Sequence, residues 1–245
     1  RAQGSTGLAH LIAAGSIAPD VFIAITPGPM RIVLNAGKAR EASPIARTEM
    51  VIAYSPSSRY YSALAHADRP GSAPWWKILE SPGFRFGRTD PLIDPQGRNV
   101  VFVMNLAANY YRRPDLPDKI LGPILNPRQI FLEPQVMARL QSGQLDAASA
   151  YETQPLALGL PFIRLPDEIN LGNVAMESRY RRAAMMLNGK TVRPEPLVFY
   201  AAALTRAPHP ELAANFIRWL RGPSAQAILS QYRYDSPGDT KPLVN

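Results

Sequence analysis

The sequence alternates short apolar runs with segments of helical periodicity, and this alternation restricts the fold more than any other feature. The runs at residues 18–25 and 197–204 are bounded by turn residues, as expected for strands buried in a sheet. Segments 134–142 and 211–221 carry apolar residues three and four positions apart, which is typical of helices that cover a sheet. The pattern therefore predicts an α/β protein with a parallel or mixed sheet.

The other predicted elements follow the same alternation. We expect further strands at 49–54, 84–87, 146–152 and 160–165, and further helices at 5–14, 30–35, 72–79, 99–111 and 224–232. Within the segment 171–194, which has no clear periodicity, the only element we predict is a helix over 177–187.

The composition limits the classes of protein that fit. A chain of 245 residues is long enough for one large domain or two lobes with cores of their own. No apolar run approaches the roughly 20 residues needed to cross a bilayer, and we expect any signal peptide to be absent because no charged leader opens the chain. With no cysteine, disulfides, thiolate metal sites and a cysteine nucleophile are excluded.

The charge balance favours an anionic partner. The net charge is +8, from 27 Lys and Arg against 19 Asp and Glu, which suits an anionic ligand, a nucleic acid or an anionic membrane surface. Basic residues are dispersed and are not interleaved with aromatic residues, so the pattern argues against nucleic-acid binding.

Enzyme motifs are missing from the sequence. It contains no G-x-S-x-G elbow, no P-loop and no G-x-G-x-x-G. The three histidines are far apart and lack metal-ligand spacing; they are His10, His66 and His209. The tyrosine pairs 60–61 and 110–111 could bind ferric iron through phenolates, but such residues are more often found at surfaces and interfaces.

Residues 87–98 form the most distinctive loop. An apolar run enters this loop and a helical run leaves it, and within it lie two prolines, two glycines, two aspartates and two arginines. A strand, a polar loop and a helix N-terminus together are how α/β proteins build anion sites, because the first helical N–H groups have no partners within the helix. A well-capped connecting loop fits the same residues equally well.

Other polar residues lie at the ends of predicted strands or the starts of predicted helices. Ser5 would cap the first helix, Glu133 precedes the helix that begins at residue 134, and Tyr151 and Glu152 end a strand. Ligands of open α/β sheets bind beyond the carboxyl ends of the strands. Each residue alone is explained by a simple cap, whereas together with the 94–97 turn they resemble one converging site.

Three segments carry a resemblance to a known family. Residues 4–23 are similar to a segment that holds a ligand-binding serine, and residues 165–172, L-P-D-E-I-N-L-G, resemble a stretch of its tungstate-type branch. Residues 210–226 look like the C-terminal helices of many related proteins. The family is that of the periplasmic molybdate/tungstate-binding proteins of ABC importers.

The resemblance implies a two-lobed periplasmic-binding-protein fold of type II, α/β with mixed sheets flanked by helices and a hinge. Lobe 1 would comprise residues 1–54 and 198–245, and lobe 2 residues 55–197. The oxyanion would be captured between the lobes and delivered to the importer. The family's first strand and an early serine loop have no counterpart before Arg1, so we expect lobe 1 to lack its N-terminal strand.

The resemblance also assigns ligand-binding residues. Ser5 and Tyr151 match a serine and a tyrosine that bind the oxyanion, while Gln96 and the turn at Glu133 fall where backbone N–H groups contact it. Asp94 falls where a carboxylate approaches the metal atom of the oxyanion in the tungstate-type branch.

A second carboxylate is expected at the metal atom, and Glu152 is our candidate for it. Two carboxylates beside a dianion would repel it, but molybdenum and tungsten can accept extra oxygen ligands from Asp and Glu. The sulfur of sulfate cannot expand its coordination in this way. Asp94 and Glu152 would therefore favour molybdate or tungstate over sulfate.

The implied protein is no enzyme, has no catalytic residues, and has no cofactor apart from its ligand. It would act as a monomer in the periplasm or outside the cell. Whether a lipid anchors it before processing is left open. Its partners would be the membrane subunits of the importer, and it would neither bind nucleic acid nor span the membrane.

Two alternatives stay open. The first is a different ligand, such as ferric iron, a phosphate-like anion or an organic anion. Arg88 or Arg98 would favour one of the two kinds of anion if either side chain faced the site. The second is a hydrolase that uses Asp94 and Glu152 as paired carboxylates.

Overall fold

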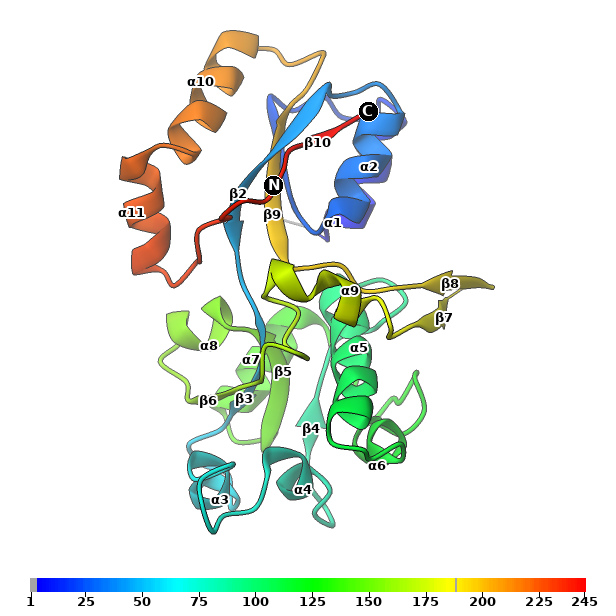
Figure 1. The fold of residues 1–245 in the computed structure, drawn as a ribbon, viewed down its shortest axis with the longest axis vertical. Coiled ribbons are helices and arrows are strands. Elements are labelled where there is room, and N and C mark those ends of the chain that lie inside the picture. Colours follow the sequence, from blue (N-terminus) through cyan, green and yellow to red (C-terminus); the bar gives the residue numbers. More distant parts are fainter. Residues whose placement is uncertain (1–3, 188) are drawn as a thin grey trace. The chain divides into compact units, whose positions relative to one another are not determined.

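The computed structural model describes residues 4–187 and 189–245, and the chain divides into two compact units (Figure 1). Unit 1 consists of Arg1–Thr48 with Glu195–Asn245, and unit 2 of Glu49–Pro194. The division expected from the sequence placed residues 49–54 in the first lobe. In the structure this strand belongs to unit 2, because it pairs with two other strands of that unit.

Unit 1 is built on a four-stranded antiparallel sheet with the order β1-β9-β2-β10. Its strands are β1 (Val21–Ile25), β9 (Val198–Ala203), β2 (Glu41–Arg47) and β10 (Leu243–Val244). Strand β9 comes from the last quarter of the chain and lies between two strands from the first quarter, with Ala201 opposite both Ile23 and Ser43.

Two pairs of helices cover this sheet. Figure 1 shows α1 (Ser5–Ala13) and α2 (Pro27–Asn35) on one side of it, and α10 (Pro210–Leu220) and α11 (Pro223–Gln231) on the other. On the side of α10 and α11 lies a buried cluster of Ile45, Ala201 and Leu220.

The first helix corrects one expectation. Helix α1 begins at Ser5, and the residue at its N-cap position is Gly4, without a side-chain cap. The prediction that Ser5 caps this helix is therefore wrong. The hydroxyl of Ser5 lies within the first turn, where it does not accept from the free N–H groups as a capping side chain would.

Unit 2 contains a four-stranded mixed sheet with the order β4-β5-β3-β6. Its strands are β3 (Met50–Tyr54), β4 (Phe86–Gly87), β5 (Ala147–Tyr151) and β6 (Phe162–Arg164). Strand β3 is antiparallel to β5 and β6, whereas β4 is parallel to β5. The two sheets and their flanking helices confirm the α/β class expected from the sequence, although only the sheet of unit 2 is mixed.

Strand β5 is the centre of unit 2, and its small side chains let helices approach both faces. Ala148 and Ala150 face α7 (Glu133–Gln141) in a buried cluster that includes Val136 and Leu140. Because side chains alternate along a strand, the intervening residues face the other side, which is covered by α5 (Pro95–Tyr110).

Short elements complete unit 2. They are α3 (Tyr61–Ala65), α4 (Trp75–Leu79), α6 (Leu116–Leu121), α8 (Thr153–Ala157), the 3-10 turn Val174–Met176, α9 (Glu177–Tyr180), β7 (Met185–Leu187) and β8 (Lys190–Val192). No helix among the described residues is long and apolar enough to cross a membrane.

One prediction of secondary structure is wrong, and one strand was not predicted. The helix expected over 177–187 ends at Tyr180, because Met185–Leu187 pairs with Lys190–Val192 in a hairpin whose turn includes Gly189 at a φ of +74°. Strand β2 was not predicted at all. Pro44 lies within it, and the register shifts between Pro44 and Ala46, so its sequence lacks a regular apolar pattern.

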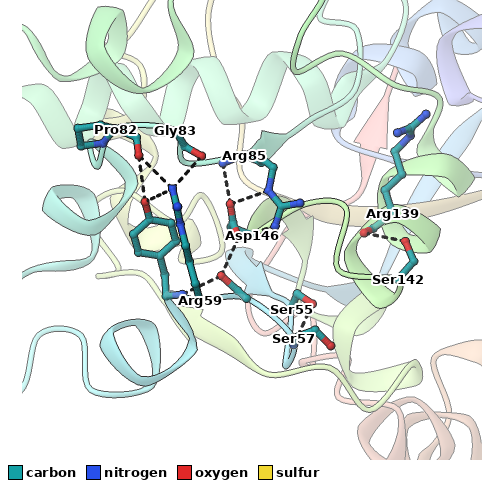
Figure 2. A network of polar contacts seen from close by, with 11 residues as sticks. Ser55, Ser57, Arg59, Pro82, Gly83, Arg85, Arg139, Ser142 and Asp146 are labelled. Carbon is teal, nitrogen blue, oxygen red and sulfur yellow. Dashed lines mark hydrogen bonds and ion pairs between the residues drawn. The ribbon is translucent and has the colours of Figure 1, made fainter.

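The buried carboxylate of Asp146 joins neighbouring strand ends of unit 2 (Figure 2). These ends lie at the edge of the sheet away from Tyr151, which ends β5. Asp146, whose side chain is 1% exposed, accepts hydrogen bonds from the Arg85 backbone N–H at 2.9 Å and from its guanidinium at 2.8 and 3.0 Å. The Ser58 hydroxyl donates a further bond of 2.8 Å. Burial raises the pKa of Asp146, but these donors outweigh it and hold the pKa below 3.8.

We predict that Asp146→Asn destabilises the protein by about 1–3 kcal/mol at pH 7, because the substitution removes a charged acceptor from buried donors. Since the folded-state pKa is depressed, this stabilisation is fully present above pH 3.8 and is lost as the pH falls through the folded value. Urea unfolding at several pH values measures both effects.

The matched control is Asp118→Asn, an exposed aspartate of unit 2, which should change the free energy of unfolding little. A cost for Asp146→Asn that persists unchanged at pH 2 would contradict the ionic account.

Candidate functional site

Asp94 is placed by the loop that connects β4 to α5. The Asp90 side chain accepts from the Leu92 N–H at 2.8 Å, and the Asp94 N–H bonds to the Asp90 carbonyl at 2.9 Å. Asp94 is the N-cap of α5, accepting from the Gln96 N–H at 2.8 Å, and Pro95 is the first helical residue. The loop is therefore a well-capped turn, and its cap is also the candidate ligand.

The carboxyl of Asp94 lies in a partly desolvated position. Burial raises its pKa above 3.8, although the N–H groups of Gln96 and Gly97 and the charge of Arg98 act in the opposite direction. The group is half-buried and not sealed from solvent.

Gln96 joins the start of α5 to strand β5. Its side chain is 2% exposed, and its amide nitrogen donates to the Ser149 carbonyl at 2.9 Å and to the Gln154 side-chain oxygen at 3.1 Å. The backbone N–H expected to contact an oxyanion is bonded to Asp94 in this structure. Gln96 therefore lies in the first turn of α5, and its contact with an oxyanion stays a prediction.

Glu133 is the first residue of α7 and lies close to Asp94. Gln154 donates a hydrogen bond of 2.7 Å to its carboxylate. Burial and the negative charge of Asp94 raise the pKa of Glu133 above 4.5, while the bond from Gln154 lowers it. The two carboxylates are thus within electrostatic range of each other.

Tyr151 ends β5 beside the same groups. Its hydroxyl oxygen accepts from the Asn99 amide at 3.1 Å, and its backbone N–H donates to Gln154 at 2.9 Å. Burial and the charge of Asp94 raise its pKa well above 10. The hydroxyl therefore keeps its proton. Because the Asn99 amide donates to the hydroxyl oxygen, the O–H group can in turn donate its proton to an anion.

The structure does not bring Glu152 to this cluster. Glu152 is a buried residue, 3% exposed, and its carboxylate pairs with Arg164. Arg164 also bonds to Glu49 at 3.1 Å. Ser5 belongs to unit 1, where it is half-buried, and its part in a site stays a prediction.

Three further residues of the cluster were not assigned a role from the sequence. Asn99 and Gln154 supply hydrogen bonds within the cluster, and no sequence motif indicates either of them. Arg98 is half-buried, and burial lowers its pKa while the nearby Asp94 and Tyr151 raise it. The positive charge of Arg98 therefore acts on both of these candidate ligands.

Arg88 has a different role. It is 0% exposed and donates to the carbonyls of Pro123 and Ile124 at 3.1 and 2.7 Å and to the Gln129 side chain at 3.1 Å. Burial lowers its pKa to about 10. Arg88 thus anchors the segment that leads from α6 to α7.

Gly97 lets the loop pack directly on the first turn of α5. A Cβ atom at this position would lie 2.4 Å from the Thr89 carbonyl oxygen and 2.8 Å from the Pro91 nitrogen. Both contacts are with backbone, which has little freedom to move. Glycine is therefore needed to keep Asp94 in its place.

The arrangement suits a ligand that binds both acceptor groups and donor groups of the protein. Asp94 and Glu133 lie at the starts of α5 and α7, and the protonated Tyr151 lies at the end of β5. Helix α7 begins without a side-chain cap, so no capping side chain neutralises the positive end of its dipole. Within residues 4–187 and 189–245 no group of three or more His, Asp or Glu side chains could hold a resident metal ion.

The chain belongs to the family of bacterial extracellular solute-binding proteins, whose pattern matches residues 1–235. One relative, an uncharacterized solute-binding protein of Petrotoga mobilis, is 31% identical over 194 residues, covering 76% of this chain. Another is the molybdate/tungstate-binding protein WtpA of Thermococcus kodakarensis, 29% identical over 212 residues and 78% of this chain. The chain spans 58% of the length of each relative.

Among solved structures, the fold resembles the periplasmic molybdate-binding protein of Azotobacter vinelandii. The TM-score is 0.61 at 19% identity, with 94% of this chain and 84% of that chain covered. This likeness supports the type II periplasmic-binding-protein fold expected from the sequence.

We predict that Gly97→Ala destabilises the protein by roughly 1–3 kcal/mol, because the added methyl group forces backbone apart in a packed region. Chemical denaturation measures the loss. Gly28→Ala is the matched control, since Gly28 also lies in a first helical turn and its Cβ would be 3.7 Å from the nearest side-chain atom. Equal stability of the two variants would contradict the packing argument.

Proposed function

We propose that this chain is the ligand-binding part of a protein that captures molybdate or tungstate for an ABC importer. The observation that carries the proposal is the pair of carboxylates, Asp94 and Glu133, beside the proton-donating Tyr151. Membership of a solute-binding family and the WtpA relative support the same ligand class.

The chemistry of the pair explains the choice of anion. Carboxylates repel a sulfate or phosphate dianion, and the repulsion is strong where water is excluded. A molybdenum or tungsten centre can accept carboxylate oxygens as additional ligands, which turns the repulsion into a bond. Tyr151 and the N–H groups at the start of α7 would then hold the outer oxygens.

We assign the second carboxylate to Glu133 in place of Glu152. Glu133 lies in electrostatic range of Asp94, whereas Glu152 is buried in an ion pair with Arg164. Breaking such a pair to reach a ligand would leave a buried charge uncompensated. The same ion pair argues against a hydrolase that uses Asp94 and Glu152 together.

Ferric iron is the strongest competing ligand, because two carboxylates and a tyrosine are also a set that iron accepts. A phenolate ligand must lose its proton, and the raised pKa of Tyr151 opposes that loss. The pair Tyr110–Tyr111 is no better, since the Tyr111 hydroxyl bonds to Trp75 and burial raises its pKa to about 12.

The partners and location belong to this proposal. The membrane subunits of an importer would receive the oxyanion, and the protein would act as a monomer in the periplasm or outside the cell. A lipid anchor before processing would be compatible with this location, and no cofactor is required.

We predict that Asp94→Asn and Glu133→Gln each weaken tungstate binding by about 10- to 100-fold, a loss of about 1.4–2.7 kcal/mol. Asparagine keeps the helix cap while removing the charge, so the Asp94 variant separates coordination from capping. Titration calorimetry with tungstate, molybdate and sulfate measures the effect.

The control is Glu152→Gln, which should leave the tungstate affinity close to that of the wild type. A loss confined to Glu152→Gln would overturn the reassignment of the second carboxylate. Sulfate binding as tight as tungstate binding would overturn the coordination argument itself.

We also predict that tungstate affinity falls on acidification with a midpoint above pH 4.5, the ordinary value for glutamate. Both carboxyls must be ionised to bind the metal centre, and both pKa values are raised. The affinity is therefore full above the raised values and is lost as the pH falls through them. A midpoint below pH 4 in calorimetric titrations would contradict this.

A further inference from the structure

Gln154 contacts three of the four candidate ligand residues that unit 2 brings together. It lies at the start of α8, three residues beyond Tyr151. Its side-chain oxygen accepts from the Tyr151 N–H at 2.9 Å and from the Gln96 amide at 3.1 Å. Its nitrogen donates to the Glu133 carboxylate at 2.7 Å.

These contacts fix which way the amide points. An oxygen that accepts two N–H groups cannot exchange places with the nitrogen, because a flipped amide would direct its own hydrogens at the Tyr151 N–H. The amide nitrogen is therefore held toward Glu133. Glutamate would keep both accepted bonds, yet it would lose the donor and add a negative charge.

We propose that Gln154 is a positioning residue that holds the Glu133 carboxylate in place for an oxyanion whose central atom accepts it as a ligand. This inference rests on the proposed function and adds a residue that selects for such oxyanions. Gln154 does not itself contact the ligand in this scheme.

The need for such a residue follows from the place of Glu133. Glu133 is an exposed residue at the first position of a helix, with only its carboxyl partly desolvated, and a glutamate in such a place has several rotamers of similar energy. Coordination of a metal centre requires one of them. A hydrogen bond of 2.7 Å to a side chain that is itself held from two sides selects that rotamer before the ligand arrives.

The same residue links the two carboxylates. Gln154 bonds to the Gln96 side chain, and the Gln96 backbone N–H donates to the Asp94 carboxylate at 2.8 Å. Both ligand-bearing loops are thereby joined to the end of β5. Gln154 also favours the ionised form of Glu133, which partly offsets the burial and the repulsion by Asp94.

The test compares Gln154→Glu and Gln154→Leu with Gln141→Glu, which adds the same charge at the exposed end of α7. We expect the Gln154 variants to bind tungstate at least about 10-fold more weakly, and the Gln141 variant to bind like the wild type. In the Glu133→Gln background, Gln154→Leu should cause little further loss, because the two residues act as a unit.

A second measurement needs no ligand. The carboxyl of Glu133, identified in carbon-13 spectra by its absence from Glu133→Gln, should titrate at higher pH in both Gln154 variants than in the wild type. Wild-type affinity in the Gln154 variants, or an unchanged Glu133 titration, would overturn the inference. If the wild type binds no tungstate, the proposed function fails, and the titration alone decides whether Gln154 controls Glu133.

Discussion

The buried carboxylate of Asp146 holds the framework on which the site of unit 2 depends. Asp146 directly precedes β5, and its side chain joins the start of this strand to Arg85, just before β4, and to Ser58, in the turn that follows β3. A strand held at its start presents its other end in a defined position, and Tyr151 and Gln154 lie at that end. Rigid support at one end of a sheet and ligand-binding groups at the other is the arrangement that α/β proteins commonly use.

The candidate site is built from groups that each satisfy an ordinary structural need. Asp94 caps a helix, Gln96 bonds to the neighbouring strand, and Tyr151 ends that strand. What distinguishes the cluster is that the pKa values of both carboxyls, Asp94 and Glu133, are raised, mainly by burial and for Glu133 also by the charge of Asp94. Such an arrangement opposes stability unless a ligand uses it, which is why perturbed carboxyls mark functional sites.

The sequence predicted the alternation of strands and helices and the positions of Asp94, Gln96, Glu133 and Tyr151, because caps, strand ends and apolar periodicity are local patterns. It could not indicate Gln154, whose role depends on contacts with residues 96 and 133 that only the fold brings near. The position of Glu152 depends on the fold in the same way. Glu152 lies beyond the end of β5, at the N-cap position of α8 with helical backbone angles, and its carboxylate pairs with Arg164.

Strand β9 has a consequence for the order in which the molecule can form. Unit 2 is one continuous stretch of chain, so all of its contacts are available once residue 194 has been synthesised. The sheet of unit 1 has no centre until β9 arrives, because β1 and β2 each pair with β9 and not with each other. During synthesis from the N-terminus, unit 1 can therefore complete its sheet only after unit 2, which is inserted within it, has been synthesised.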